Sequence, residues 1–268
     1  MLEIFQYDFI VRGLIAGIIV AFIAPLIGIF LVLRRYSLIA DTLSHISLAG
    51  VAVAFLFGWN PMITTIGVTT FSSIGIEKLR NTKHIYGESS LALFLSGGLA
   101  LATVLLSIGK GFDSNLLNYL FGSIVTVTSN DIITILVLAV IIVALLITFY
   151  KELVYITFDE ESAKVSGLPV RFINTIFIML VAFTVSLAIP IIGILLITAL
   201  IVIPVVTALQ LRKSFIKTII YSEIISVFSV VSGIFISYYF NLSTGGTIVL
   251  LMLAIFSLFM LSKNYLKI

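Results

Sequence analysis

Asp41 and His45 are the residues whose types and spacing are best suited to chemistry. They lie four positions apart inside an apolar run at 38–57. On an α-helix this spacing puts both side chains on one face, about 6 Å apart along the axis. Carboxylates and imidazoles are ordinary ligands of Zn²⁺ and also bind Mn²⁺ or Fe²⁺. The pair predicts a metal site. The alternative is a structural pair hydrogen-bonded to itself or to Ser44 and Ser47.

The depth of this pair in a membrane follows from the helical rise. If Arg35 marks the cytoplasmic boundary, Asp41 lies about 9 Å and His45 about 15 Å beyond it. His45 would then be near the middle of a hydrocarbon core about 30 Å thick, which favours a transit site. Two ligands are too few for a stable site. A homodimer with these helices facing across a two-fold axis would supply four, the usual number for zinc.

Three other polar residues have types that could take part in a site. Glu223 lies about 9 Å beyond Lys217, near the cytoplasmic boundary, and a packing or interfacial role is expected for it. Asp131 begins an apolar run, where an acid complements the helix dipole, and no chemistry is assigned to it. His84 follows Lys83 in a polar stretch and is expected to be solvated.

A cytoplasmic segment at 158–168 has the pattern of a short capped helix. Asp159 can cap its start, Glu160 would occupy the first turn, and Gly167 followed by Pro169 would end it. Its apolar edge would consist of Ala163, Val165 and Leu168. Such a helix could dock a soluble partner. An ordinary capped connector is the alternative.

The composition requires a membrane to solvate the chain. Of the 268 residues, 61% are hydrophobic and 10% are charged, and the mean hydropathy is +1.29. A soluble globular protein would have too little polar surface to face water. There is no cysteine, so disulfides and thiolate metal sites are excluded. The basic residues are dispersed and give no nucleic-acid footprint.

These properties predict an all-α polytopic bundle in one domain, residues 1–268, because only helices and closed barrels satisfy the backbone in lipid. Between the spans at 171–189 and 191–210, we expect Ile189 and Pro190 to form a kink or a tight hairpin. The expected spans are 9–33, 38–57, 61–77, 89–108, 129–150, 171–189, 191–210, 215–239 and 246–262.

The distribution of basic residues orients the bundle. All of the 15 lysines and arginines except Arg12 and Lys110 fall on one side, which is the cytoplasmic side by the positive-inside rule. Nine crossings put the N-terminus outside and the C-terminus inside. If the first run does not cross, eight crossings remain and both ends are inside. The expected location is the bacterial cytoplasmic membrane.

Several catalytic motifs are missing from the sequence. It has no Gly-x-x-x-x-Gly-Lys-Ser/Thr phosphate loop, so the chain is not expected to bind ATP in that way. It also lacks the His-Glu-x-x-His of zincin proteases and the Gly-x-Ser-x-Gly elbow. An intramembrane enzyme using Asp41 and His45 as acid and base would need a nucleophile or a third ligand, so no enzymatic activity is expected.

Four blocks of sequence resemble the membrane permeases of the zinc, manganese and iron(II) ABC importers. They are GIFLVLRRYSLIADTLSHISLAG (28–50), YLFGSIVTV (119–127), FDEESAKVSGLPV (158–170) and GILLITALIVIPVVTA (193–208). Together they are distributed over most of the chain, and the first is the most specific.

The resemblance implies a permease homodimer with two ATP-binding subunits and an external metal-binding protein. It implies a role in metal passage for Asp41 and His45. It also implies that the segment at 158–168 is the coupling helix that seats in the ATPase. The coupling residues would be Asp159, Glu160, Ala163 and Gly167.

The cargo is expected to be zinc, with manganese next, and no permanently bound cofactor is expected. The string DTLSHISLAGVA, residues 41–52, looks more like the zinc permeases of Gram-positive bacteria than like the manganese permeases. One departure concerns Asn241 and Ser243, where many relatives have Asp and Pro, so an outer-gate acid is not expected here. The alternative function is a stand-alone, ion-driven metal transporter without an ATPase.

Overall fold

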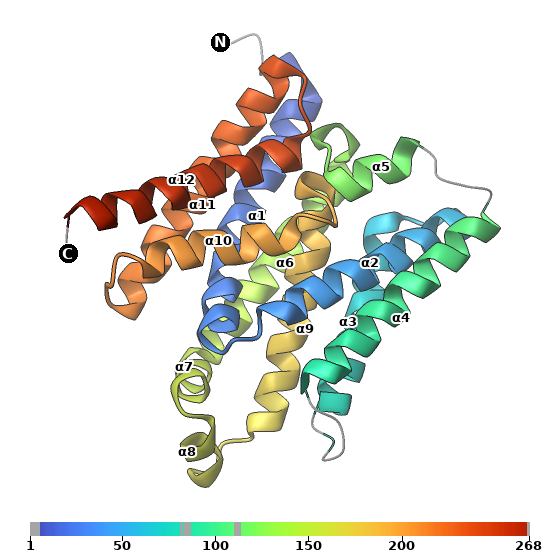
Figure 1. Cartoon of the computed structure of the whole chain (residues 1–268). Helices are drawn as coiled ribbons and strands as arrows, with labels where there is room; N and C mark the ends of the chain where they lie inside the picture. The colour runs from blue at the N-terminus through green and yellow to red at the C-terminus, as the bar shows by residue number, and fades with distance from the viewer. Residues whose placement is uncertain (1–5, 81, 83–86, 110–113, 267–268) are drawn as a thin grey trace.

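The predicted all-α architecture is confirmed. The computed structural model describes residues 6–80, 82, 87–109 and 114–266. These residues form helices and turns, with no strand among them (Figure 1). The helices are, in chain order, α1 (Asp8–Leu33), α2 (Ser37–Phe57), α3 (Pro61–Arg80), α4 (Gly87–Ile108), α5 (Ser114–Phe121), the 3₁₀ turn η2 (Ile124–Thr126), α6 (Ser129–Thr148), α7 (Tyr150–Phe158), α8 (Glu160–Val165), α9 (Val170–Ile192), α10 (Ile197–Leu209), α11 (Phe215–Phe240) and α12 (Thr244–Leu266).

The chain is a multi-pass membrane protein. Within the described residues, seven helices are long and apolar enough to cross a membrane: α1, α2, α4, α6, α9, α11 and α12. The helices α3 and α10 occupy the two remaining predicted ranges. Helix α3 has 20 residues but ends in a charged turn that contains Glu77, Lys78 and Arg80. Helix α10 has only 13 residues, about 20 Å of rise, which is less than the hydrocarbon thickness.

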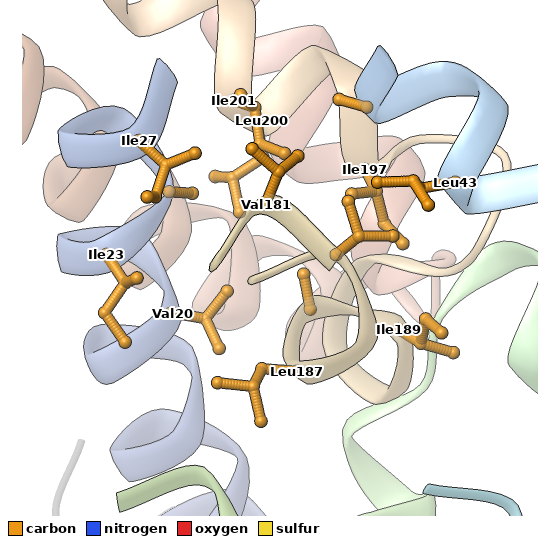
Figure 2. Packing of buried hydrophobic residues seen from close by; sticks show 14 of the residues in the cluster. Val20, Ile23, Ile27, Leu43, Val181, Leu187, Ile189, Ile197, Leu200 and Ile201 are labelled. Carbon is orange, nitrogen blue, oxygen red and sulfur yellow. The ribbon is translucent and has the colours of Figure 1, made fainter. Parts of the chain in front are cut away.

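Burial divides the long helices into inner and outer ones. In α9, 78% of the most apolar window is buried inside the protein, compared with 17% in α4 and 22% in α6. Helix α1 contacts α6, α9, α10 and α11, while α2 contacts α3, α4, α9 and α10. Figure 2 shows the core where α1, α9, α10 and α2 meet, with Ile27, Val181, Ile201 and Leu43 among its side chains. The exposed apolar faces of the outer helices are suited to lipid.

The predicted boundary between Ile189 and Pro190 is wrong by about one turn. Helix α9 continues through Pro190 and ends at Ile192. The carbonyl oxygen of Pro190 lies in the last turn of α9 and accepts a hydrogen bond from the backbone N–H of Ser123, at 3.0 Å. The last carbonyls of a helix have no partner within it, and this bond satisfies one of them.

Gly193 ends the helix and starts a non-helical connection to α10. Its φ of 86° lies in the left-handed region, and a Cβ atom built there would be 2.3 Å from the backbone nitrogen of Gly122. The backbone N–H of Ile194 donates to the carbonyl of Tyr119 at 2.9 Å. The second and fourth blocks of the sequence resemblance are thus hydrogen-bonded to each other, and this contact fixes where α10 begins.

Candidate functional site

Asp41 and His45 lie on one exposed strip of a helix that is mostly buried. The side chain of Asp41 is 38% exposed and that of His45 is 22% exposed. Leu38 lies one turn earlier and is 55% exposed, while Ala40, Leu43 and Ser44 between them are buried. Leu38, Asp41 and His45 are called the α2 strip below. The helical spacing therefore placed both candidate ligands together, as predicted.

The contacts within the pair leave its polar atoms largely free of the helix. The Nε2 atom of His45 lies 3.8 Å from Oδ1 of Asp41, which is longer than a hydrogen bond. The Nδ1 atom of His45 is shielded and has no hydrogen-bond partner among the described residues. The hydroxyl of Ser44 donates to the backbone carbonyl of Asp41 at 2.7 Å, and Ser47 donates to the carbonyl of Ser44. The serines therefore bond to their own helix rather than to the carboxylate.

Thr198 is a site residue that the sequence did not suggest. Its hydroxyl donates to Oδ1 of Asp41 at 3.3 Å, across 157 positions of the chain. It is the second residue of α10, directly after the non-helical connection at 193–196. Membrane transporters commonly build ion sites where a helix is interrupted. A short apolar segment bounded by Gly193 and interrupted by Pro204 was the available signal.

One chain supplies two candidate metal ligands at this place. Among the described residues, no group of three or more His, Cys, Asp or Glu side chains lies together. The hydroxyl oxygen of Thr198 lies beside Asp41 and is an uncharged atom that could also bind a metal. A site with the usual four ligands of zinc would need further donors from outside this set of side chains.

The segment at 158–168 folds into the expected capped helix, α8. The Oδ1 atom of Asp159 accepts a hydrogen bond from the backbone N–H of Ser162 at 2.9 Å. Gly167 follows the helix with a φ of 85°, a conformation that favours glycine. Figure 1 shows α8 at one end of the molecule, next to the start of α9.

The expected apolar edge of α8 is divided between two directions. Ala163 is 0% exposed and packs inside the chain, whereas Val165 is 90% exposed. Ala163 therefore seats α8 on its own protein, and Val165 is presented outward. Burial tends to raise the pKa of Glu160, but the hydrogen bond and charge of Lys164, with the charges of Arg34 and Arg80, hold this pKa below its ordinary range.

The other candidates lie apart from this site. The carboxylate oxygens of Glu223 are shielded and have no hydrogen-bond partner among the described residues. Glu223 lies in an apolar groove along α11 with Val227 and Phe228. Asp131 forms a capping box with Thr128 at the start of α6, as expected for an acid at a helix N-terminus. His84 lies outside the described residues.

The sequence matches the ABC 3 transport family over residues 6–263. It is 36% identical to the "Probable metal transport system membrane protein" of Treponema pallidum, with 93% of this chain and 96% of that one covered. It is 32% identical to the "Manganese transport system membrane protein MntC" of Listeria monocytogenes, covering 94% and 89%. It is also 32% identical to the "High-affinity zinc uptake system membrane protein ZnuB" of Buchnera aphidicola, covering 91% and 94%.

A solved structure has the same arrangement of helices. The structure described as PsaBC from Streptococcus pneumoniae in complex with Fab is 30% identical to this chain, with a TM-score of 0.84. The match covers 95% of this chain and 91% of that one. Sequence and fold agree over nearly the whole length, and the chain therefore belongs to the ABC 3 transport family.

Proposed function

We propose that this chain is the permease subunit of an ATP-driven importer of divalent metal ions, with zinc as the favoured cargo and manganese next. The observation that carries the proposal is the α2 strip, where a carboxylate and an imidazole one turn apart are partly exposed on a buried helix. The family membership supports it, as do relatives named as manganese and zinc transport system membrane proteins.

The proposed assembly contains two copies of the permease. Each copy contributes Asp41 and His45, and two strips facing across a two-fold axis would bring four ligands together. The distance of 3.8 Å between Nε2 and Oδ1 supports a shared cation, because the two groups are close without being hydrogen-bonded to each other. The hydroxyl of Thr198 would hold the carboxylate in place.

The proposed partners are an external metal-binding protein and two cytoplasmic ATP-binding subunits. The binding protein would deliver a cation to the outer mouth, and the ATP-binding subunits would seat on α8, through Asp159, Glu160, Ala163 and Gly167. Ala163 would act by fixing α8 to the permease, since it is buried inside this chain. The C-terminus would be cytoplasmic. ATP would be hydrolysed by the partner subunits, because this sequence has no phosphate loop.

Metal uptake into proteoliposomes tests this proposal. The permease is reconstituted with its ATP-binding subunit and its binding protein, and zinc and manganese uptake are compared. Asp41→Ala and His45→Ala are expected to abolish uptake while the protein still accumulates in membranes. Glu223→Gln is the matched control, because it replaces a membrane acid whose groove is lined by α11 and not by the α2 strip. Normal uptake by both site variants would overturn the transit role.

Co-purification separates the proposal from an ion-driven transporter. An ATP-binding subunit is expected to co-purify with this chain, and Gly167→Trp is expected to break the complex because a bulky residue disfavours the left-handed conformation. Gly167→Asn is the control, since asparagine tolerates that conformation. Uptake driven by an ion gradient without the ATP-binding subunit would favour the alternative.

A further inference from the structure

A buried arginine joins α8 to the membrane helices. Arg34 follows α1, and its side chain is only 4% exposed. Its guanidinium lies 3.6 Å from a carboxylate oxygen of Glu160 on α8. It also donates to the side-chain oxygen of Asn174 on α9 at 2.8 Å. One cation thus links the end of α1 to two other helices, α8 and α9, at the same end of the bundle.

Tyr36 extends these contacts to α3. The guanidinium of Arg34 lies over the ring of Tyr36 at 4.7 Å, and that of Arg80 lies over the same ring at 4.2 Å. Arg80 also donates to the hydroxyl of Tyr36 at 3.1 Å. Glu160, Arg34, Tyr36 and Arg80 therefore form a continuous chain of contacts, called the arginine–tyrosine relay below.

The relay includes Tyr36, the residue directly before α2, which carries the candidate metal ligands. Arg34 to Tyr36 is the whole connection between α1 and α2. Arg35 is in the left-handed region with a φ of 57°, and the N–H of Tyr36 bonds to the carbonyl of Leu31 at 2.8 Å. Such a short, hydrogen-bonded turn has little slack. A displacement of Tyr36 would pass directly to the first turn of α2, which lies about 6 Å from Asp41 along the axis.

We propose that the arginine–tyrosine relay transmits movement of α8 to α2, so that Arg34 and Tyr36 are positioning residues for the proposed transit site at Asp41 and His45. This inference rests on the proposed function. Its physical basis is the cost of leaving a buried charge without a partner. If α8 moves with an ATP-binding subunit, the guanidinium of Arg34 must move with Glu160 or be left without the carboxylate that faces it. Because the ring of Tyr36 lies against that guanidinium, the start of α2 is moved too.

Lys164 is the competing partner of Glu160. Its ammonium lies 2.7 Å from the other carboxylate oxygen, but its side chain is 54% exposed. An exposed ion pair contributes little because water and salt screen it. The buried side of Glu160, facing Arg34, is therefore the side that constrains the position of α8 relative to α1.

The test measures metal ions imported per ATP hydrolysed, using the complete complex in proteoliposomes. Tyr36→Leu removes the ring, Tyr36→Phe keeps it, and Glu160→Gln removes the charge that faces Arg34. Tyr36→Leu and Glu160→Gln are expected to lower the ratio about fivefold or more, the lower range of coupling between distant sites. Tyr36→Phe should retain most of the ratio. Glu161→Gln is the matched control, since it removes an exposed carboxylate from the same turn.

A double substitution adds a second readout. If both residues act through one relay, Tyr36→Leu combined with Glu160→Gln should lower the ratio no further than the more severe single change. Independent effects that multiply would overturn the relay. Should Tyr36→Leu fail to accumulate in membranes, the comparison of Glu160→Gln with Glu161→Gln still decides, because both acids lie in the first turn of α8 and Glu160 is the one that faces Arg34.

The outcomes separate this inference from the proposed function. A normal import ratio in Tyr36→Leu and Glu160→Gln, with an active wild-type complex, refutes the relay and leaves the importer proposal intact. Equal loss of uptake and of ATP hydrolysis also refutes it, because a merely structural role gives that result. Failure of the wild-type complex to import either metal refutes the proposed function itself.

Discussion

Replacing Thr198 by valine tests the geometry of the candidate site with the smallest change. Valine has the shape of threonine but lacks the hydroxyl that donates to Asp41 at 3.3 Å. Hydrogen bonds to charged groups contribute about 1.5–3 kcal/mol. This one is longer than the usual O–H···O distance of about 2.5–3.0 Å, so the lower figure applies. About 1.4 kcal/mol corresponds to a factor of about ten.

The expected result is a loss of up to about tenfold in the initial rate of metal uptake. The physical reason is that the carboxylate of Asp41 loses the group that orients it toward the route of the ion. The assay uses proteoliposomes with saturating amounts of metal-loaded binding protein, so that delivery does not limit the rate. Thr198→Ser keeps the hydroxyl and is the matched control.

Three results would refute this reasoning. An unchanged uptake rate in Thr198→Val would mean that Asp41 needs no orientation from α10. A faster rate would mean that the hydroxyl competes with the metal for the carboxylate. Equal impairment of Thr198→Ser and Thr198→Val would assign the effect to packing, because the two variants differ in the hydroxyl that the prediction depends on.

Three further predictions concern the break before α10, the cap of α8 and the proposed dimer. Gly193→Ala should lower the midpoint of thermal unfolding by about 4 °C or more. The left-handed backbone costs alanine about 1–2 kcal/mol, and the new Cβ atom would overlap Gly122. Gly67→Ala is the control and should leave the midpoint unchanged, because open space surrounds Gly67. Asp159→Ala should increase proteolysis within α8, and Asp159→Ser should not. The side-chain and backbone hydrogen bonds from Ser162 lower the pKa of Asp159, so the cap is lost only as pH falls below the ordinary aspartate value, and cleavage should be constant between about pH 8 and pH 5. Leu38→Cys, as the sole thiol, should cross-link two permeases on oxidation, whereas Leu250→Cys on α12 should not form a cross-link.

The elements with strong local signals could be predicted from the sequence. The run at 38–57 became α2 at Ser37–Phe57, and the cap and glycine around 159–167 became the ends of α8. These predictions depend on residues close in sequence, where helical spacing and capping chemistry are sufficient. The juxtaposition of Asp41 with His45 belongs to the same class.

The remaining features depend on contacts between distant segments. Pro190 appeared to end a helix, but α9 continues to Ile192, and the backbone N–H of Ser123 satisfies a carbonyl of its last turn. Arg34 was interpreted only as a marker of the cytoplasmic side, and its contacts with Glu160 and Asn174 could not be inferred from spacing. Thr198 reaches Asp41 across 157 positions of the chain, and α10 begins just after Gly193 packs against Gly122. Charge and hydropathy patterns contain no information on such pairings.

The small number of ligands in each chain has a consequence for release in the proposed dimer. A transit site must hold the cation long enough to select it and then let it go. Two strips that face each other would offer four ligands, and separating them would leave two per chain, which is below the usual coordination of zinc. The same movement that opens the path would therefore weaken the site. A single chain with four ligands of its own would retain the cation, whereas ligands divided between two copies couple affinity to the distance between the α2 strips.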